Sequence, residues 1–223
     1  MALRLVDVQQ SILRKNTTLA LELRERFARG GTFVFNLLSS PGAGKTTLLQ
    51  ATLTSLHARY RCAALVGDQA TERDAVRLAR SGAPVRQIAT GAECRLDAQM
   101  VTAALAQFDI GTPEVLAIEN VGNLICPAEY DLGEDLRVVV FSVTEGEDKP
   151  LKYPLAFTTA DAAVISKIDL AEATEFDRDA AVAHMRSVNP ELKVIDVSAK
   201  TGEGMQTWFD FLDRQIASKR VYA

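Results

Sequence analysis

Residues 39 to 47 read Ser-Ser-Pro-Gly-Ala-Gly-Lys-Thr-Thr, and this stretch decides the fold of the chain. An apolar run, residues 33–38, comes directly before it, and a helical pattern over residues 45–60 begins inside it. A strand, a glycine-rich turn and a helix are the setting in which Gly-x₄-Gly-Lys-Ser/Thr binds the phosphates of a nucleoside triphosphate. Ser39 takes the place of the first glycine, so the match is incomplete. We predict a phosphate-binding loop; the alternative is a glycine-rich turn that binds nothing.

Each part of this loop has a predicted contact. Glycines at 42 and 44 let backbone N–H groups turn toward the phosphates, and the following helix adds its dipole. Lys45 is expected to reach the β- and γ-phosphates, and Thr46 to bind Mg²⁺. The predicted nucleotide-binding residues of the loop are Ser40, Gly42, Ala43, Gly44, Lys45, Thr46 and Thr47.

Apolar runs of strand length alternate with helical patterns along the chain. Most of these runs are continuously apolar, which is typical of strands covered on both faces. The predicted fold class is therefore α/β, a single P-loop domain with a mostly parallel sheet of about seven strands flanked by helices. The predicted strands are 33–38, 62–66, 85–88, 115–118, 138–143, 162–166 and 193–197, and the predicted helices are 45–60, 72–80, 97–108, 172–187 and 205–217.

The first 30 residues form a different pattern. Leu19, Leu23 and Phe27 recur at four-residue spacing, which predicts a helix packed on the domain, and Gly30-Gly31 ends it. A length of 223 residues fits one large domain. We predict a helical extension over 1–30 and a P-loop domain over 31–223.

Composition excludes several classes of protein. The net charge of −4 and a pI of about 5.3 argue against a nucleic-acid-binding surface. No run of 18 apolar residues exists, so no membrane span is expected, and the N-terminus lacks a signal-peptide pattern. Three cysteines are too few for a disulfide framework. We expect a cytoplasmic protein with reduced thiols.

A tetrapeptide late in the chain predicts the base. Residues 166–169 read Ser-Lys-Ile-Asp, follow an apolar run, and resemble the Asn/Thr-Lys-x-Asp element of GTPases. The Asp169 carboxylate can accept hydrogen bonds from the N1–H and 2-amino groups of guanine. Adenine offers neither, so it loses about 1–3 kcal/mol per unmade bond. The Lys167 stem can lie over the base plane. Ser166 is shorter than the usual residue, and we expect it to brace the loop less well.

A second triplet supports the same base. Ser198, Ala199 and Lys200 follow the last predicted strand and resemble the second guanine-contacting element of GTPases. Either triplet alone is weak, but both stand after strands behind a P-loop. Guanine is therefore favoured over adenine.

Four residues are predicted to act on the phosphates: Lys45, Asp68, Glu119 and Gly122. Asp68 ends the second predicted strand, where a carboxylate can bind Mg²⁺ or orient water; the alternative is a cap for the following helix. Residues 119–122 stand where GTPases carry Asp-x-x-Gly, whose acid binds the metal shell and whose glycine N–H senses the γ-phosphate. No glutamine follows to orient water, so we expect slow intrinsic hydrolysis.

Longer stretches resemble one family, the nickel-incorporation GTPases of hydrogenase maturation, or HypB family, of the SIMIBI class of P-loop GTPases. Ser39 in place of the first glycine fits this family as well. The matching stretches are 38–48 (LSSPGAGKTTL), 67–71 (GDQAT), 96–100 (LDAQM), 118–127 (IENVGNLICP), 143–154 (VTEGEDKPLKYP), 167–170 (KIDL) and 197–205 (VSAKTGEGM).

The resemblance implies a GTP-hydrolysing metallochaperone switch that assists nickel insertion into [NiFe]-hydrogenase. It also implies a nucleotide-dependent homodimer that binds Mg²⁺ with GTP, and hydrogenase maturation factors and the hydrogenase large subunit as partners.

The resemblance implies a transition-metal site as well. A Cys-His pair and a later cysteine bind Ni²⁺ or Zn²⁺ in the family, and the matching positions here are Cys94-Arg95 and Cys126. Arginine cannot ligate a metal. Two chains related by a two-fold axis could still supply four thiolates, or Glu93 could offer an oxygen. The alternative is a pair of ordinary buried or interfacial cysteines.

Two other functions stay open. Arg95 suggests a GTPase that has lost nickel handling and serves as an assembly or regulatory factor. A small-molecule P-loop kinase is the less favoured alternative, because residues 167–169 and 198–200 favour guanine. Cys62 is expected in the core, and His57 and His184 in surface or packing positions.

Overall fold

The computed structural model describes residues 2–68 and 73–221, with side chains from 10 to 68 and from 73 to 219. Its centre is a seven-stranded sheet in the order β3-β2-β4-β1-β5-β6-β7, and all neighbouring strands pair in parallel. The predicted α/β class is confirmed. The strands are β1 Phe33–Ser39, β2 Cys62–Asp68, β3 Val85–Ala89, β4 Val115–Gly122, β5 Leu136–Ser142, β6 Ala162–Ser166 and β7 Lys193–Val197.

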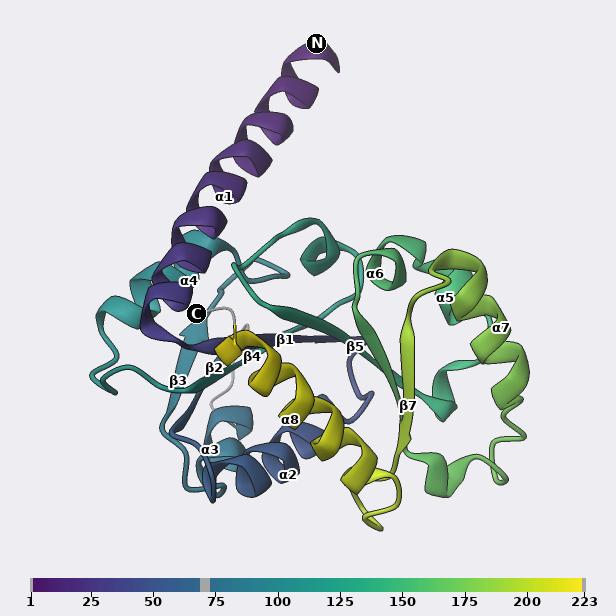
Figure 1. The fold of residues 1–223 in the computed structure, drawn as a ribbon. Coiled ribbons are helices and arrows are strands. Elements are labelled where there is room, and N and C mark those ends of the chain that lie inside the picture. The colour runs from purple at the N-terminus through teal and green to yellow at the C-terminus, as the bar shows by residue number, and fades with distance from the viewer. Residues whose placement is uncertain (1, 69–72, 222–223) are drawn as a thin grey trace.

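Helices connect and cover these strands (Figure 1). The predicted helix over 172–187 begins six residues later, because Asp177 caps it by accepting a hydrogen bond from Ala180 N. The expected start at residue 72 lies outside the described residues. Two short helices, α5 and α6, were not predicted, since four and five residues are too few for periodicity to be seen. The helices are α1 Ala2–Gly30, α2 Lys45–His57, α3 Arg73–Ala79, α4 Ala98–Ala106, α5 Lys149–Lys152, α6 Pro154–Thr158, α7 Arg178–Val188 and α8 Met205–Val221.

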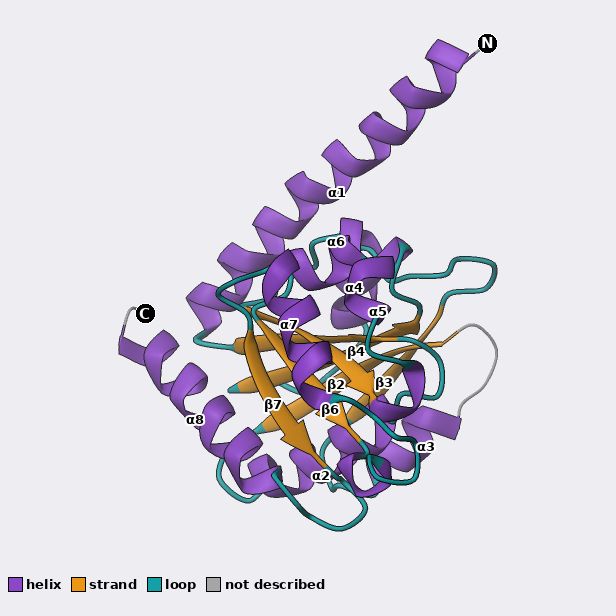
Figure 2. Cartoon of the chain, turned by 90° about the vertical axis from the view of Figure 1, so that its right-hand side faces the viewer, coloured by secondary structure: helices purple, strands orange, loops and turns teal. Residues whose placement is uncertain are grey.

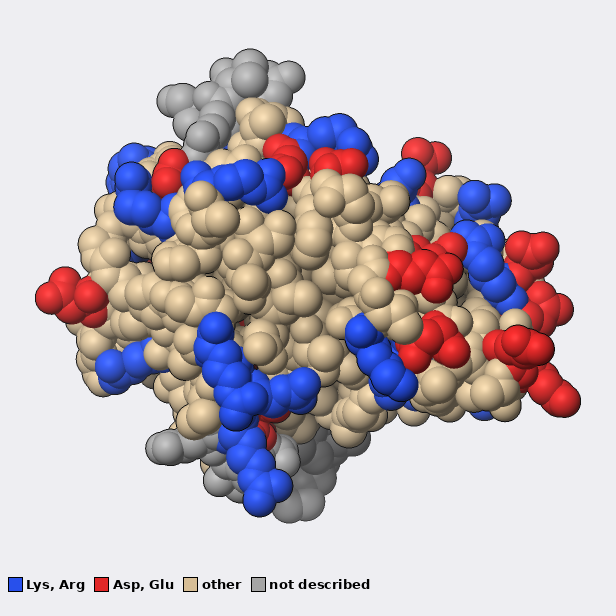
Figure 3. Space-filling model, turned by 90° about the horizontal axis from the view of Figure 1, so that it is seen from below, with Lys and Arg blue, Asp and Glu red and all other residues tan. Residues whose placement is uncertain are grey.

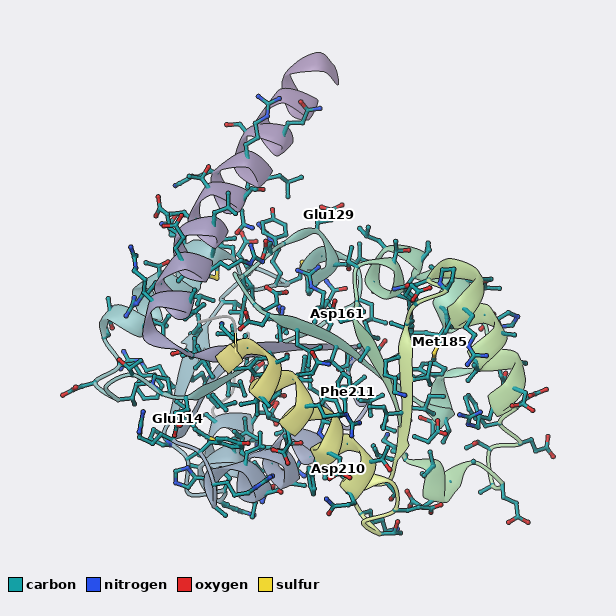
Figure 4. All side chains as sticks on the ribbon, in the orientation of Figure 1. Glu114, Glu129, Asp161, Met185, Asp210 and Phe211 are labelled. Carbon is teal, nitrogen blue, oxygen red and sulfur yellow. The ribbon has the colours of Figure 1, made fainter. Side chains whose placement is uncertain are left out.

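The sheet has apolar residues on both faces, and helices cover each of them (Figure 2). Phe35 and Leu37 of β1 face a cluster formed with α2 and α8, to which Phe211 belongs. Leu38 faces a cluster formed with α6 and α7, which includes Met185. Figure 4 labels Met185 and Phe211 on their two helices. This two-sided burial explains why the strands read as continuous apolar runs.

Helix α1 is anchored at its C-terminal half and projects from the body at its N-terminal half (Figure 1). Ala20, Leu23 and Phe27 are buried in a third cluster, with α4 and the other half of the sheet. Gly133 lies so close to this helix that a Cβ atom there would stand 2.8 Å from Ala20 O. The predicted helix and its end at Gly30 are confirmed; its separation from the domain as an extension stays a prediction. Among the described residues, no helix combines the length and the apolarity that crossing a membrane requires.

Strand β1 lies where the order of the sheet divides, with β4 on one side and β5 on the other. Ligands of doubly wound sheets bind at the carboxyl ends of the strands at such a division. The loop that follows β1 is residues 39–47, so the topology places the predicted phosphate loop at the expected crevice.

Candidate nucleotide-binding site

A cavity of about 570 Å³ opens above the loop that joins β1 to α2. Seven of its lining residues are the P-loop residues predicted to bind nucleotide: Ser40, Gly42, Ala43, Gly44, Lys45, Thr46 and Thr47. Asp68, Val121, Gly122 and Lys167 line it from three other strand ends. The structure therefore brings together, around one hollow, residues far apart in the sequence.

The backbone of the loop requires glycine at two positions. Gly42 and Gly44 have φ angles of 79° and 91°, in the region that side-chain-bearing residues avoid. Ser39 does not need to be glycine, because it is the last residue of β1, and its hydroxyl donates to Ser40 O at 2.8 Å. The departure from the usual pattern thus leaves the turn itself unchanged.

Lys45 and Thr46 both contact Glu119 across the site. Lys45 Nζ lies 2.8 Å and Thr46 Oγ1 lies 2.6 Å from Oε1 of this fully buried carboxylate. The second oxygen, Oε2, has no hydrogen-bond partner in the described part of the chain. A carboxylate therefore holds the two groups that a phosphate and its Mg²⁺ would bind.

Asp68 and Gly122 flank the loop as the sequence predicts. Asp68 is the last residue of β2 and lines the phosphate cavity. Gly122 ends β4, and a Cβ atom there would lie 3.2 Å from Pro41 Cα, so the strand end packs directly on the loop. Residues 69–71 of the GDQAT stretch lie outside the described residues.

A second cavity, of about 200 Å³, adjoins the first and is lined by Lys167, Asp169, Ser198, Ala199 and Lys200. The Asp169 carboxylate accepts a hydrogen bond from Ser198 Oγ at 2.6 Å, which fixes its orientation. Lys200 Nζ lies 3.9 Å from the same carboxylate but is largely exposed. Both predicted base-contacting triplets thus meet in one pocket, next to the cavity lined by the P-loop.

The base loop is tied to the phosphate loop. Lys167 adopts a positive φ of 59° and donates from Nζ to Gly42 O at 2.6 Å. Ser166 Oγ donates to Ala43 O, also at 2.6 Å, from a buried position. Ser166 therefore does brace the P-loop through its hydroxyl; that it does so less well than a longer residue stays a prediction.

Two residues that line the phosphate cavity were missed in the sequence. Asp74 and Arg77, both of α3, contribute to its wall, and Arg77 Nη2 donates to Thr47 Oγ1 at 2.8 Å. They belong to no phosphate-binding motif, and a single charged residue on a short helix reads as solvated surface. No pattern in the sequence points to them.

Cys94 and Cys126 lie together, with their sulfur atoms 2.6 Å apart, and both are free thiols. The contact with Cys94 and partial burial raise the pKa of Cys126 above its usual range. In the described part of the chain, no three His, Cys, Asp or Glu side chains gather as a metal site. One chain therefore supplies a thiol pair, and a full ligand set needs donors from elsewhere.

The Arg95 side chain is engaged with Tyr130 and Glu93 and is not a metal ligand. Its guanidinium carbon lies 4.0 Å from the centroid of the Tyr130 ring, and it pairs with Glu93. One oxygen of Glu93 is thereby paired with Arg95, and an oxygen ligand from Glu93 stays a prediction. His57 is exposed, and His184 Nδ1 contacts Glu147 O at 2.8 Å, which agrees with surface and packing positions.

Strand β4 joins the nucleotide site to the cysteine pair. Asn120 follows Glu119, is fully buried, and accepts a hydrogen bond from Leu96 N at 3.1 Å. Asn123 Nδ2 donates to Cys94 O at 3.3 Å. One continuous segment therefore contacts both the P-loop and the loop that carries Cys94.

Cys62 is buried in the core, as predicted, and burial raises the pKa of its thiol to about 12. Because the thiolate is the reactive species, we expect no alkylation of Cys62 by iodoacetamide at pH 8 in the folded protein. In urea it should react fully. Peptide mapping by mass spectrometry measures this, with Cys62→Ala as the control that leaves the native labelling stoichiometry unchanged. Modification of Cys62 at equal rates in folded and unfolded protein would contradict this burial.

The parallel sheet, the P-loop and the Asp169 pocket define a P-loop GTPase. A family model described as "CobW/HypB/UreG, nucleotide-binding domain" matches residues 33–196. The hydrogenase maturation factor HypB of Azotobacter vinelandii is 50% identical over 216 residues, which cover 97% of this chain and 71% of the relative. The chain belongs to the HypB family within this group. The membership confirms the resemblance, supports GTP hydrolysis and removes the kinase alternative.

Two solved structures share the fold. HypB from Archaeoglobus fulgidus superposes with a TM-score of 0.85 at 40% identity, covering 91% of this chain and 99% of its own. HypB from Helicobacter pylori, solved in complex with nickel, has a TM-score of 0.86 at 38% identity, covering 92% of this chain and 96% of its own.

Proposed function

We propose that this chain binds and hydrolyses GTP with Mg²⁺ and uses the nucleotide state to time nickel delivery during [NiFe]-hydrogenase maturation. The single observation that carries the proposal is the segment 119–123, the end of β4 and the residue after it, which contacts the P-loop at Glu119 and the cysteine loop at Asn120 and Asn123. Relatives named as hydrogenase maturation factors, and the nickel complex of one of them, support the cargo.

The phosphate chemistry follows from the residues around the cavity. Lys45 would supply positive charge to the β- and γ-phosphates, and Thr46 and Asp68 are the residues that would hold Mg²⁺, which would neutralise charge on the phosphates. The base is held by Asp169, with Lys167 along its plane. The Gly122 N–H senses the γ-phosphate. No glutamine follows Gly122, so intrinsic hydrolysis is slow and dimerisation or a partner accelerates it.

The coupling step is a change at Glu119. This carboxylate holds Lys45 and Thr46. In the nucleotide complex, Lys45 would bind the phosphates and Thr46 would bind Mg²⁺ instead. When Lys45 and Thr46 leave Glu119, the carboxyl end of β4 loses these contacts. The hydrogen bonds of Asn120 and Asn123 then carry the change to the loop of Cys94. A ligand shifts a two-state element only through such differential contacts.

The metal-binding unit is proposed to be a homodimer in the cytoplasm, with the hydrogenase large subunit and other maturation factors as partners. Each chain brings one thiol pair, and two chains related by a two-fold axis bring four thiolates, a complete set for Ni²⁺ or Zn²⁺. Ile125, next to Cys126, is 62% exposed, which suits a surface that a second copy covers.

Nickel titration and light scattering test the coupling. Nickel affinity and dimer fraction should differ between GDP and a non-hydrolysable GTP analogue, and Cys94→Ala/Cys126→Ala should lose nickel binding in both states. Cys62→Ala is the matched control, because it removes a thiol but keeps the pair. Equal affinity and dimer fraction in the two nucleotide states would show that no coupling exists.

Arg95 favours a second candidate, a GTPase that serves as an assembly or regulatory factor without handling nickel. The guanidinium is stacked on Tyr130 and leaves the thiol pair without its neighbouring ligand. Nickel affinity equal in the parent and in Cys94→Ala/Cys126→Ala would favour this candidate. Arg95→His should raise nickel affinity if the thiol pair is a working site.

A further inference from the structure

Arg77 reaches out of α3 to the P-loop helix. The side chain is half-buried, and its Nη2 donates to Thr47 Oγ1 at 2.8 Å. No carboxylate among the described residues lies within ion-pair distance of this guanidinium, although Asp74 shares its helix. A partly desolvated arginine with a single neutral partner has donors left for an anion.

The contact with Thr47 shows which part of the nucleotide site Arg77 faces. Thr47 lines both the phosphate cavity and the base pocket, together with Gly44 and Lys167. Lys45 and Thr46 stand at the β- and γ-phosphate end, and Asp169 stands at the base end. An α-phosphate would therefore lie at the junction of the two cavities.

The electrostatic setting agrees with an anion at this point. Arg77 and Lys167 line the same cavity from opposite sides of the P-loop, on α3 and after β6. Basic side chains gather over α3 on the face shown in Figure 3. Guanidinium groups bind phosphate through two parallel, charge-assisted hydrogen bonds, which are stronger than the bond to a hydroxyl.

We propose that Arg77 binds the α-phosphate of the guanine nucleotide, exchanging its bond to Thr47 for the phosphate oxygens. Because GTP, GDP and GMP all carry this phosphate, Arg77 contributes affinity without distinguishing the nucleotide states. Through it the nucleotide also holds α3 against α2. The inference rests on the nucleotide site proposed above and is independent of nickel delivery.

Competition binding with Arg77→Ala tests this assignment. The affinities for GTP, GDP and GMP should each fall by about 10- to 100-fold, the range for charge-assisted bonds, while guanosine binding at millimolar concentration stays unchanged. Arg77→Lys, which keeps the charge but loses the fork, should fall in between. Arg80→Ala is the matched control, since this exposed arginine directly follows α3.

Three outcomes overturn the proposal. Unchanged affinities for all nucleotides would show that Arg77 makes no contact with them. A loss for GTP alone would move the contact to the terminal phosphate. An equal loss for guanosine, or a full loss in Arg77→Lys with its fold intact by circular dichroism, would mean that Arg77 only positions α3. Failure of nickel coupling would leave the expected result unaffected.

Discussion

Replacing Lys45 with methionine is expected to slow GTP hydrolysis strongly and to lower the free energy of unfolding of the nucleotide-free protein by about 3 kcal/mol. The first effect follows because Lys45 carries the charge that stabilises the transferred phosphoryl group, a loss worth about 10²- to 10³-fold in rate. The second follows from Glu119, whose buried carboxylate pairs with Lys45 at 2.8 Å. Without the lysine, a buried charge keeps only the hydroxyl of Thr46.

Urea denaturation, followed by the fluorescence of the single tryptophan, Trp208, measures the free energy of unfolding. The double variant Lys45→Met/Glu119→Leu should recover most of the lost stability and none of the hydrolysis, because an apolar pair can replace a buried ion pair. Lys152→Met, which breaks an exposed pair with Asp148, is the control and should leave the free energy of unfolding nearly unchanged. An unchanged unfolding free energy in Lys45→Met would disprove the role given to Glu119.

Asp169→Asn is expected to weaken GTP binding by about 100-fold or more. The carboxylate accepts two hydrogen bonds from guanine, and an amide offers one acceptor and a clashing donor, at a cost of about 1–3 kcal/mol for each bond. Xanthosine triphosphate should gain affinity in the same variant, because its C2 carbonyl accepts a hydrogen bond from the new amide. Isothermal titration calorimetry with both nucleotides and ATP measures the exchange.

Ser198→Ala separates orientation from recognition. Ser198 Oγ orients the Asp169 carboxylate through a hydrogen bond of 2.6 Å, but its loss leaves the carboxylate itself in place. Ser198→Ala should therefore lower the affinity for GTP by about tenfold and should not raise the affinity for xanthosine triphosphate. GTP affinity that is unchanged in Asp169→Asn would reverse the assignment of guanine. If Asp169→Asn and Ser198→Ala changed the affinity for xanthosine triphosphate equally, the effect would come from a change in the conformation of the base-binding loop instead.

Local patterns were enough for the architecture and the nucleotide site. Most strands are continuous apolar runs because they are buried on both faces, whereas β3 and β7 carry polar residues and are only partly buried. All seven strands lie where predicted, with ends shifted by at most two residues except in β4, which runs four residues further, to Gly122. The P-loop was readable because Gly42 and Gly44 serve a backbone conformation that few other residues adopt. The base triplets were readable because they stand directly after strands.

The pairing of side chains across the sheet was decided only by the tertiary structure. Glu119 binds Lys45 and Thr46, residues more than 70 positions away, and its predicted place at a metal shell stays a prediction. Arg77 reaches Thr47 from a helix that no motif marks. Such contacts depend on which strand ends become neighbours in the order β2-β4-β1, and no local pattern carries that information.

The sequence alone determined a P-loop nucleotide fold, its base preference and its family, because backbone conformation, two-sided burial and base chemistry each demand particular residues at short spacing. The tertiary structure decided that Cys94 and Cys126 meet, that Arg95 stacks on Tyr130, and that β4 connects both sites. These are relations between distant segments, and they exist only once the packed core has fixed where each strand ends.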